Sequence, residues 1–125
     1  MNHNIIISDT DARRLRDLLE KAPRNGADEL LNRLAGELDR AHIVPQAELP
    51  EDVVALGSTV ELEDLEDGEV MTYTLTLPGE ADASAGRISV LAPLGTGMLG
   101  YRVGDEFEWP VPTGTVKMRI RRKLS

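Results

Sequence analysis

The chain has 125 residues, of which 41% are hydrophobic and only 3% aromatic, so we expect one domain, or a small domain with an appendage, around a mostly aliphatic core. Its formal net charge of −8 argues against nonspecific binding to DNA or RNA, and the absence of cysteine excludes disulfides and thiolate metal sites. The chain contains neither a signal-peptide pattern nor an apolar run near the roughly 18 residues of a membrane span, so we expect a cytoplasmic protein without membrane contact.

Two amphipathic helices are predicted at the N-terminal end, after a short extended lead over residues 1–7. Ser8 is typical of a helix N-cap, and Asp11 follows it at the capping-box position. Pro23 ends the first helix, and Asn25 can cap the second. Each helix carries an apolar stripe, made of Leu15, Leu18, Leu19 and Ala22 in the first and of Leu30, Leu31, Leu34, Ala35, Leu38 and Ala41 in the second.

These helices are joined by about four residues, so they should pair antiparallel as a hairpin, a short coiled coil within residues 1–44. At ~1.5 Å per residue, a first helix of ~14 residues reaches only ~20 Å. Two arrangements are open, a hairpin that projects from the rest of the chain and a helical cap packed flat on it. The helix rules alone do not separate them.

Residues 45–52 are predicted to form an exposed and fairly stiff linker, because Pro45 and Pro50 stand among three acidic residues. The domain boundary is therefore placed here, with a second domain over residues 53–125. The apolar pattern changes at this point from a helical period to the alternation of β-strands.

Five short, mostly antiparallel strands and one short helix are predicted in the second domain, which makes the fold class α+β. Residues 66–69 supply a hairpin turn between the first two strands. Pro93 ends the third strand, and Gly100 can end the following helical turn in a left-handed conformation. The strands centre on Val60 and Leu62, Met71–Leu77, Arg87–Leu91, Glu106–Val111 and Val116–Ile120.

Opposite charges gather in two of these strand regions. The acidic residues 61–69 and the basic residues 117–123 are interpreted as neighbours in the sheet, where cross-strand pairs contribute ~0.2–1 kcal/mol each. The alternative is a nucleic-acid patch made by the basic residues. Phe107 and Trp109 alternate with charged residues on one strand, so both are interpreted as core side chains.

The stretch GRISVLAPLGTGMLGYRVGDEFEW, residues 86–109, resembles the C-terminal domain of the Gre transcript-cleavage factors, which bind bacterial RNA polymerase. GSTVELEDLEDGEVMTYTL, residues 57–75, looks like the opening of the same domain. The runs IIISDTDARRLRDLLE and LNRLAGELDRAHIVPQAELPEDVV resemble the shorter, Rnk-type branch of this family. The resemblance covers residues 5–120, implies an FKBP-like fold for the second domain, and favours the projecting hairpin.

In Gre factors, the segment between the third strand and the short helix docks on a coiled coil at the rim of the polymerase channel. The resemblance assigns this role to Leu91, Ala92 and Pro93, supported by Leu94 and Leu99. Ala92 stands where Gre factors tend to have serine, which removes one hydrogen bond. The alternative is that Pro93 only ends a strand and that Leu94 and Leu99 are core residues.

Gre factors also carry acidic residues at the hairpin tip that help to hold a catalytic magnesium ion. The corresponding acids here, Asp28 and Glu29, fall in the first turn of the second helix, where they stabilise the helix N-terminus. The hairpin is also shorter than that of a Gre factor, so we expect neither a metal site nor transcript cleavage. The predicted tip consists of Pro23, Arg24, Asn25, Gly26, Asp28 and Glu29.

The sequence thus predicts a non-catalytic regulator that binds RNA polymerase at the rim of the secondary channel and competes with Gre factors. We expect a monomer without a cofactor and without direct nucleic-acid contact. No G-x-S-x-G motif is present, and His3 and His42 are isolated in the sequence, so no catalytic set of residues is apparent. The alternatives are an active Gre-type cleavage factor and a prolyl isomerase or peptide-binding chaperone module.

Overall fold

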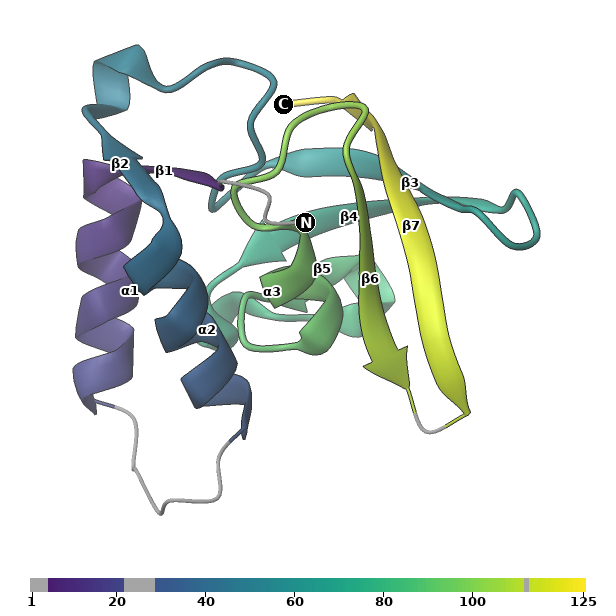
Figure 1. Ribbon diagram of the computed structural model, residues 1–125, viewed down its shortest axis with the longest axis horizontal. Coiled ribbons are helices and arrows are strands. Elements are labelled where there is room, and N and C mark those ends of the chain that lie inside the picture. The colour runs from purple at the N-terminus through teal and green to yellow at the C-terminus, as the bar shows by residue number, and fades with distance from the viewer. Residues whose placement is uncertain (1–4, 22–28, 112) are drawn as a thin grey trace.

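The computed structural model describes residues 5–21, 29–111 and 113–125. Its fold is α+β, as predicted: two helices run along one side of a curled β-sheet, and a third, short helix lies between them and the sheet (Figure 1). In chain order the elements are β1 (Ile6–Ser8), α1 (Asp9–Lys21), α2 (Glu29–Arg40), β2 (His42–Val44), η1 (Gln46–Glu48), β3 (Thr59–Asp64), β4 (Val70–Thr76), η2 (Pro78–Glu80), η3 (Ala83–Ala85), β5 (Arg87–Ser89), α3 (Pro93–Met98), β6 (Glu106–Val111) and β7 (Gly114–Lys123).

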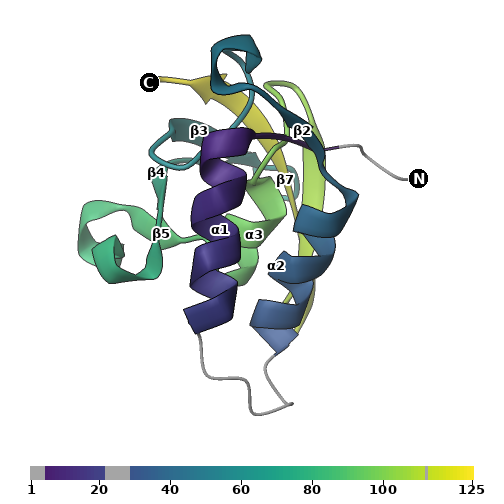
Figure 2. The same cartoon turned by 90° about the vertical axis from the view of Figure 1, so that its left-hand side faces the viewer.

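Helices α1 and α2 lie side by side (Figure 2). The cap predicted for α1 is present, because the Asp11 N–H donates a hydrogen bond of 3.1 Å to Ser8 Oγ. The apolar stripes are buried as expected, at Leu15 and Leu19 of α1 and at Leu31, Leu34 and Leu38 of α2. Burial of these stripes stabilises helices that would be marginal alone at 13 and 12 residues.

A small parallel sheet, which the sequence did not predict, joins the chain just before α1 to the chain just after α2. Part of the expected extended lead forms β1, and His42 begins β2 directly after α2. Both segments are only three residues long, but Ile7 in β1 and Ile5 just before it are each 2% exposed. The register pairs Ile6 with His42, Ile7 with Ile43 and Ser8 with Val44.

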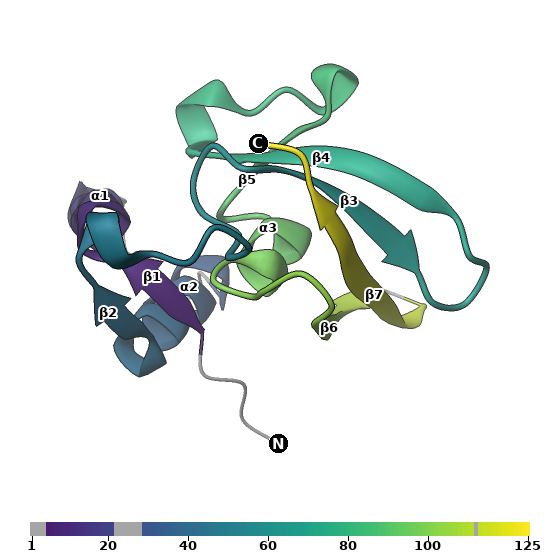
Figure 3. The ribbon, with the colours of Figure 1, turned by 90° about the horizontal axis from the view of Figure 1, so that it is seen from above.

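The main sheet has five strands in the order β5-β4-β3-β7-β6, in agreement with the predicted number. Strand β5 pairs parallel to β4, and the other neighbours pair antiparallel. The predicted hairpin turn joins β3 to β4, where Gly68 has a positive φ of 77°. Seen from above, the sheet curls away from the helix pair, and α3 occupies the space between them (Figure 3).

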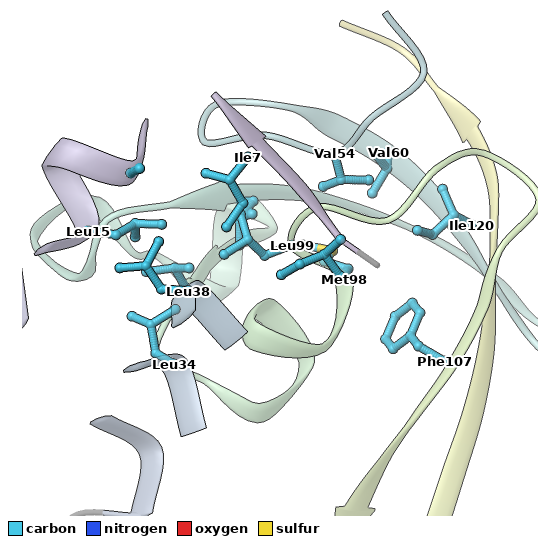
Figure 4. Packing of buried hydrophobic residues seen from close by; sticks show 14 of the residues in the cluster. Ile7, Leu15, Leu34, Leu38, Val54, Val60, Met98, Leu99, Phe107 and Ile120 are labelled. Atoms are coloured by element: carbon cyan, nitrogen blue, oxygen red, sulfur yellow. The ribbon is translucent and has the colours of Figure 1, made fainter. Parts of the chain in front are cut away.

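One hydrophobic cluster runs through the described parts of both regions, from Leu15 and Leu34 in the helix pair to Val60 and Ile120 in the sheet (Figure 4). Helix α2 also packs against α3. The described part of α2 therefore reaches the sheet region through α3, and the choice between the packed cap and the projecting hairpin stays a prediction. Residues 22–28, which include most of the predicted tip, lie outside the described residues.

The predicted linker over residues 45–52 is exposed along most of its length but held at several points. The Gln46 N–H donates to Asp9 Oδ1 at 3.1 Å, at the start of α1. The Arg102 guanidinium holds both carboxylate oxygens of Asp52, at 3.0 and 2.9 Å. These bonds connect the segment to elements on either side of it.

Within the part of the chain that the structure describes, no helix is long and apolar enough to span a membrane.

Candidate docking site

The turn between β5 and α3 contains Leu91, Ala92 and Pro93, the residues predicted to dock on a partner. Ser89 shapes this turn, because its Oγ accepts a 3.0 Å hydrogen bond from the Leu91 N–H and its carbonyl accepts one of 3.0 Å from the Ala92 N–H. Pro93 then occupies the first turn of α3, where its missing N–H costs no hydrogen bond. The backbone of the turn is therefore fixed from both sides.

Two residues of α3, Gly95 and Thr96, hold the turn in place from the helix side. A Cβ added at Gly95 would lie 2.1 Å from the Ser89 carbonyl oxygen, so only glycine fits there. Beside it, the Thr96 hydroxyl donates to the Val90 carbonyl oxygen. Such a turn loses little conformational entropy when a partner binds, which favours its use as a docking point.

The five predicted docking residues differ in exposure. Leu91, Ala92, Pro93 and Leu94 are partly exposed, so a partner can reach them. Leu99 is only 1% exposed and belongs to the core cluster, so it supports the turn from below. The core interpretation considered for Leu99 thus agrees with its burial, whereas Leu94 packs against the core and remains accessible.

A second, buried feature connects the helix pair to the sheet region. Asp11 is 6% exposed, and its Oδ2 accepts a 3.1 Å hydrogen bond from the Leu56 N–H, 45 residues away. Burial raises the pKa of the Asp11 carboxyl, and the bond from Leu56 and the charge of Arg14 oppose that rise. The sequence indicated only the capping role of Asp11, because a contact across 45 residues leaves no local pattern.

Strands β3 and β7 are neighbours, so the acidic and basic stretches meet as predicted. Arg122 binds Glu61 through two bonds of 3.1 and 2.8 Å and lowers the pKa of that carboxyl. Arg119 lies between Glu63, at 3.7 Å, and Glu106, at 2.6 Å. These pairs use part of the basic charge of β7 within the sheet, which favours the cross-strand interpretation over a nucleic-acid patch.

The aromatic residues form a small group at the α3 side of β6. Phe107 meets Tyr101 edge-to-face at a centroid distance of 5.9 Å and stacks on Trp109 at 5.8 Å. Phe107 is a core residue at 7% exposure, as predicted, whereas Trp109 packs against the core with part of its surface accessible.

The predicted hairpin tip contributes little to this picture. Glu29 is the first residue of α2, and Pro23, Arg24, Asn25, Gly26 and Asp28 lie outside the described residues. Within residues 5–21, 29–111 and 113–125, no three histidine, aspartate or glutamate side chains gather closely enough to hold a metal ion.

Comparison with known proteins divides the chain into two segments. Residues 49–122 match the family described as transcription elongation factor GreA/GreB, C-terminal, and residues 3–44 match the Rnk N-terminus. The chain belongs to the Gre family. Its Rnk-type segment contains the helix pair with β1 and β2, and its Gre-type segment contains the main sheet, α3 and the predicted docking turn.

Individual relatives agree with this assignment. The Gre-family chain is 43% identical over 110 residues to the regulator of nucleoside diphosphate kinase of Escherichia coli K12, covering 88% of this chain and 80% of the relative. It is 36% identical to the transcription elongation factor GreA of Solidesulfovibrio magneticus, covering 93% of this chain and 75% of the relative. A solved GreA/GreB elongation factor from Nitrosomonas europaea superposes with a TM-score of 0.79 at 38% identity, over 99% of this chain and 100% of that chain.

The two family segments are connected near the hydrogen bonds that the carboxylates of Asp9 and Asp11 accept from Gln46 and Leu56. Both aspartates belong to the Rnk-type segment, and Asp11 reaches Leu56 in the Gre-type segment. The predicted docking turn and the Rnk-type helix pair are thus parts of one packed unit in the described chain.

Proposed function

We propose that this Gre-family chain is a non-catalytic transcription regulator that docks on RNA polymerase at the rim of the secondary channel. The observation that supports this proposal is the fixed and partly exposed turn at Leu91–Pro93. The sequence resemblance assigns this turn to the Gre docking segment, and its shape is fixed by Ser89 and Gly95 within the chain itself. Bound at the rim, the chain would exclude Gre factors from the same site.

The short reach of the helix pair supports a role without catalysis. Helix α1 has 13 residues, which corresponds to only ~20 Å, and the described part of α2 packs on α3. Metal-assisted cleavage requires its ligands to be placed to within about an angstrom. A helix pair of this length, docked at the outer rim, would leave its acidic residues away from a catalytic metal inside the channel.

Binding to purified bacterial core RNA polymerase tests the docking step. We expect wild-type protein to bind and to be displaced by excess Gre factor. Ala92→Asp should weaken binding at least about tenfold, because it places a charge in the partly exposed turn. Ala47→Asp, the same change at an exposed residue of η1, should leave binding unchanged. Failure of the wild type to bind, or binding that Gre factor does not displace, would contradict the proposal.

Transcript cleavage is tested separately with backtracked elongation complexes. We expect no release of short RNA above the rate of the complexes alone. Release that depends on this protein, and that Asp28→Ala with Glu29→Ala abolishes, would instead identify an active cleavage factor.

A further inference from the structure

A cleft of about 560 Å³ separates α2 from β6, and α3 forms its floor. Figure 1 shows these three elements next to one another. Arg33, Gly36 and Arg40 line the α2 side, Phe107 and Trp109 line the β6 side, and Pro93 lies at the floor. The cleft therefore touches the helix pair, the sheet and the predicted docking turn at once.

The α2 side of the cleft is polar, although it faces the sheet region. The apolar stripe of α2 is buried elsewhere, at Leu31, Leu34 and Leu38, so the helix does not close against β6. Gly36 leaves further room, because it has no side chain on this face. The opposite wall offers the stacked rings of Phe107 and Trp109, with Trp109 partly accessible.

The two arginines that line the cleft differ in whether they form an ion pair. Arg40 pairs with Glu37 at 3.0 Å on the same helix. Arg33 forms no ion pair with any residue that the structure describes. Glu108 stands on the β6 side, so an anionic group would be favoured only near α2. Among the described residues that line it, the cleft thus presents Arg33 as a cation without an ion pair, opposite an aromatic surface.

We propose that this cleft is a second docking site, which binds a short polypeptide segment of RNA polymerase that presents an apolar side chain to Phe107 and Trp109 and a carboxylate to Arg33. The inference rests on the proposed function, because Pro93 belongs both to the rim-docking turn and to the floor of the cleft. A segment bound here touches α2 as well as the sheet region and so holds the helix pair against the polymerase.

The chemistry of the walls favours a polypeptide over a nucleic acid. Aromatic residues and arginine are among the residues that dominate protein–protein binding. A phosphate backbone would meet Glu37 and Glu108 as well as a net charge of −8. A single carboxylate avoids these acids by approaching from the α2 side, where Arg33 lies.

Filling the cleft without disturbing the fold provides the first test. A Cβ at Gly36 would meet only the end of the flexible Arg40 side chain, at 3.4 Å, so Gly36→Leu should fold normally. We expect it to weaken binding to core polymerase about tenfold. Asp39→Leu places the same side chain at an exposed position of α2 outside the cleft, and it should bind as the wild type does.

Charge reversal provides a second, independent variant. Arg33→Glu should weaken polymerase binding about tenfold and reduce its dependence on salt, because it repels the carboxylate. Arg16→Glu makes the same charge change at an exposed position of α1 and should leave the affinity unchanged.

Cross-linking identifies the occupant directly. The chain has no cysteine, so Gly36→Cys gives a single attachment point for a photo-cross-linker. In the polymerase complex we expect a cross-link to a polymerase peptide that contains an acid beside an apolar residue, and Asp39→Cys should not give it. Cross-links only to nucleic acid or to a second copy of this chain would overturn the inference.

The affinity measurements separate the two proposals. If Gly36→Leu and Arg33→Glu bind polymerase as tightly as the wild type while Ala92→Asp does not, the cleft has no docking role and the rim-docking proposal stands. If the wild type itself does not bind polymerase, both proposals fail.

Discussion

At the scale of single residues, Asp11 links local helix formation to the tertiary structure. Its N–H completes the cap on Ser8, and its carboxylate accepts a hydrogen bond from Leu56 at the start of the sheet region. The carboxylate is buried, so its ionised form is less stable in the folded protein than in water. The same side chain that tethers the two family segments therefore has a raised pKa.

This raised pKa makes a testable contribution to the pH dependence of stability. In the unfolded chain an aspartate ionises near ~3.9, below the folded-state value. The stabilising effect of protonated Asp11 is complete below the unfolded pKa and is lost as the pH rises through the folded pKa. Asp11→Asn keeps an oxygen acceptor for Leu56 and removes this titration. We therefore expect the variant to gain stability relative to the wild type as the pH rises above about 4.

Urea unfolding at a series of pH values measures this difference between the two free energies of unfolding. Asp39→Asn, which removes an exposed carboxylate from α2, should follow the wild type across the series. The free energies of unfolding of Asp11→Asn and the wild type could instead change in parallel from about pH 4 to pH 7. That result would show that Asp11 ionises without a cost to folding.

At the scale of elements, the chain at Ile5 and Ile6 passes very close to the end of α3. Gly100 adopts a left-handed conformation with φ of 81°, as the sequence predicted. Its carbonyl accepts a 3.1 Å hydrogen bond from the Ile6 N–H, and its N–H donates one of 2.9 Å to the Val54 carbonyl oxygen. A Cβ at this position would lie 2.7 Å from Ile5 Cβ, so the crossing leaves no room for a side chain.

Gly100→Ala should therefore lower the free energy of unfolding by about 3 kcal/mol. A left-handed conformation costs alanine about 1–2 kcal/mol, and overpacking against Ile5 adds about 1–3 kcal/mol. Gly104→Ala is the matched control, since Gly104 also has a positive φ, of 96°, but nothing within 4 Å of an added Cβ. Urea unfolding of both variants separates the two effects, and equal losses would mean that β1 can shift to admit the methyl group.

Elements with long regular patterns could be predicted from the sequence, and those made by distant segments could not. The stripe of Leu31, Leu34 and Leu38 predicted α2, and the alternation around Phe107 predicted β6 with its observed bounds. Strands β1 and β2 are three residues each, which is too short to show a period. Their pairing also depends on α1 and α2 bringing them together, so no local signal marks them.

The candidate site shows the same division. The turn at Leu91–Pro93 lies within one continuous motif, so its position followed from the sequence. The cleft beside it has walls from α2 and β6, which are more than 60 residues apart in the sequence. The sequence predicts Trp109 as a core residue, but its side chain is partly exposed, because strand alternation identifies one face of a strand and not where the covering layer ends.

At the scale of the whole molecule, the two family segments share one hydrophobic cluster within the described chain. Leu34, at 0% exposure in α2, belongs to the same cluster as Met118 and Ile120 of β7. Segments that bury their apolar surface against each other lose that stabilisation together when one of them unfolds. The sequence predicts a domain boundary at residues 45–52, but because of this shared cluster we expect the chain to unfold as one unit.

Leu34→Ala tests this coupling, because it removes a fully buried side chain of the helix pair without touching the sheet. We expect the free energy of unfolding to fall by about 2–5 kcal/mol. The urea midpoint should move by the same amount whether it is followed by the far-UV circular dichroism of the helices or by the fluorescence of the single tryptophan, Trp109 on β6. Leu124→Ala, at a side chain 48% exposed, should change stability by less than about 0.5 kcal/mol. If the helical signal moves to lower urea while Trp109 keeps its wild-type midpoint, the helix pair and the sheet unfold separately and the shared cluster does not couple them.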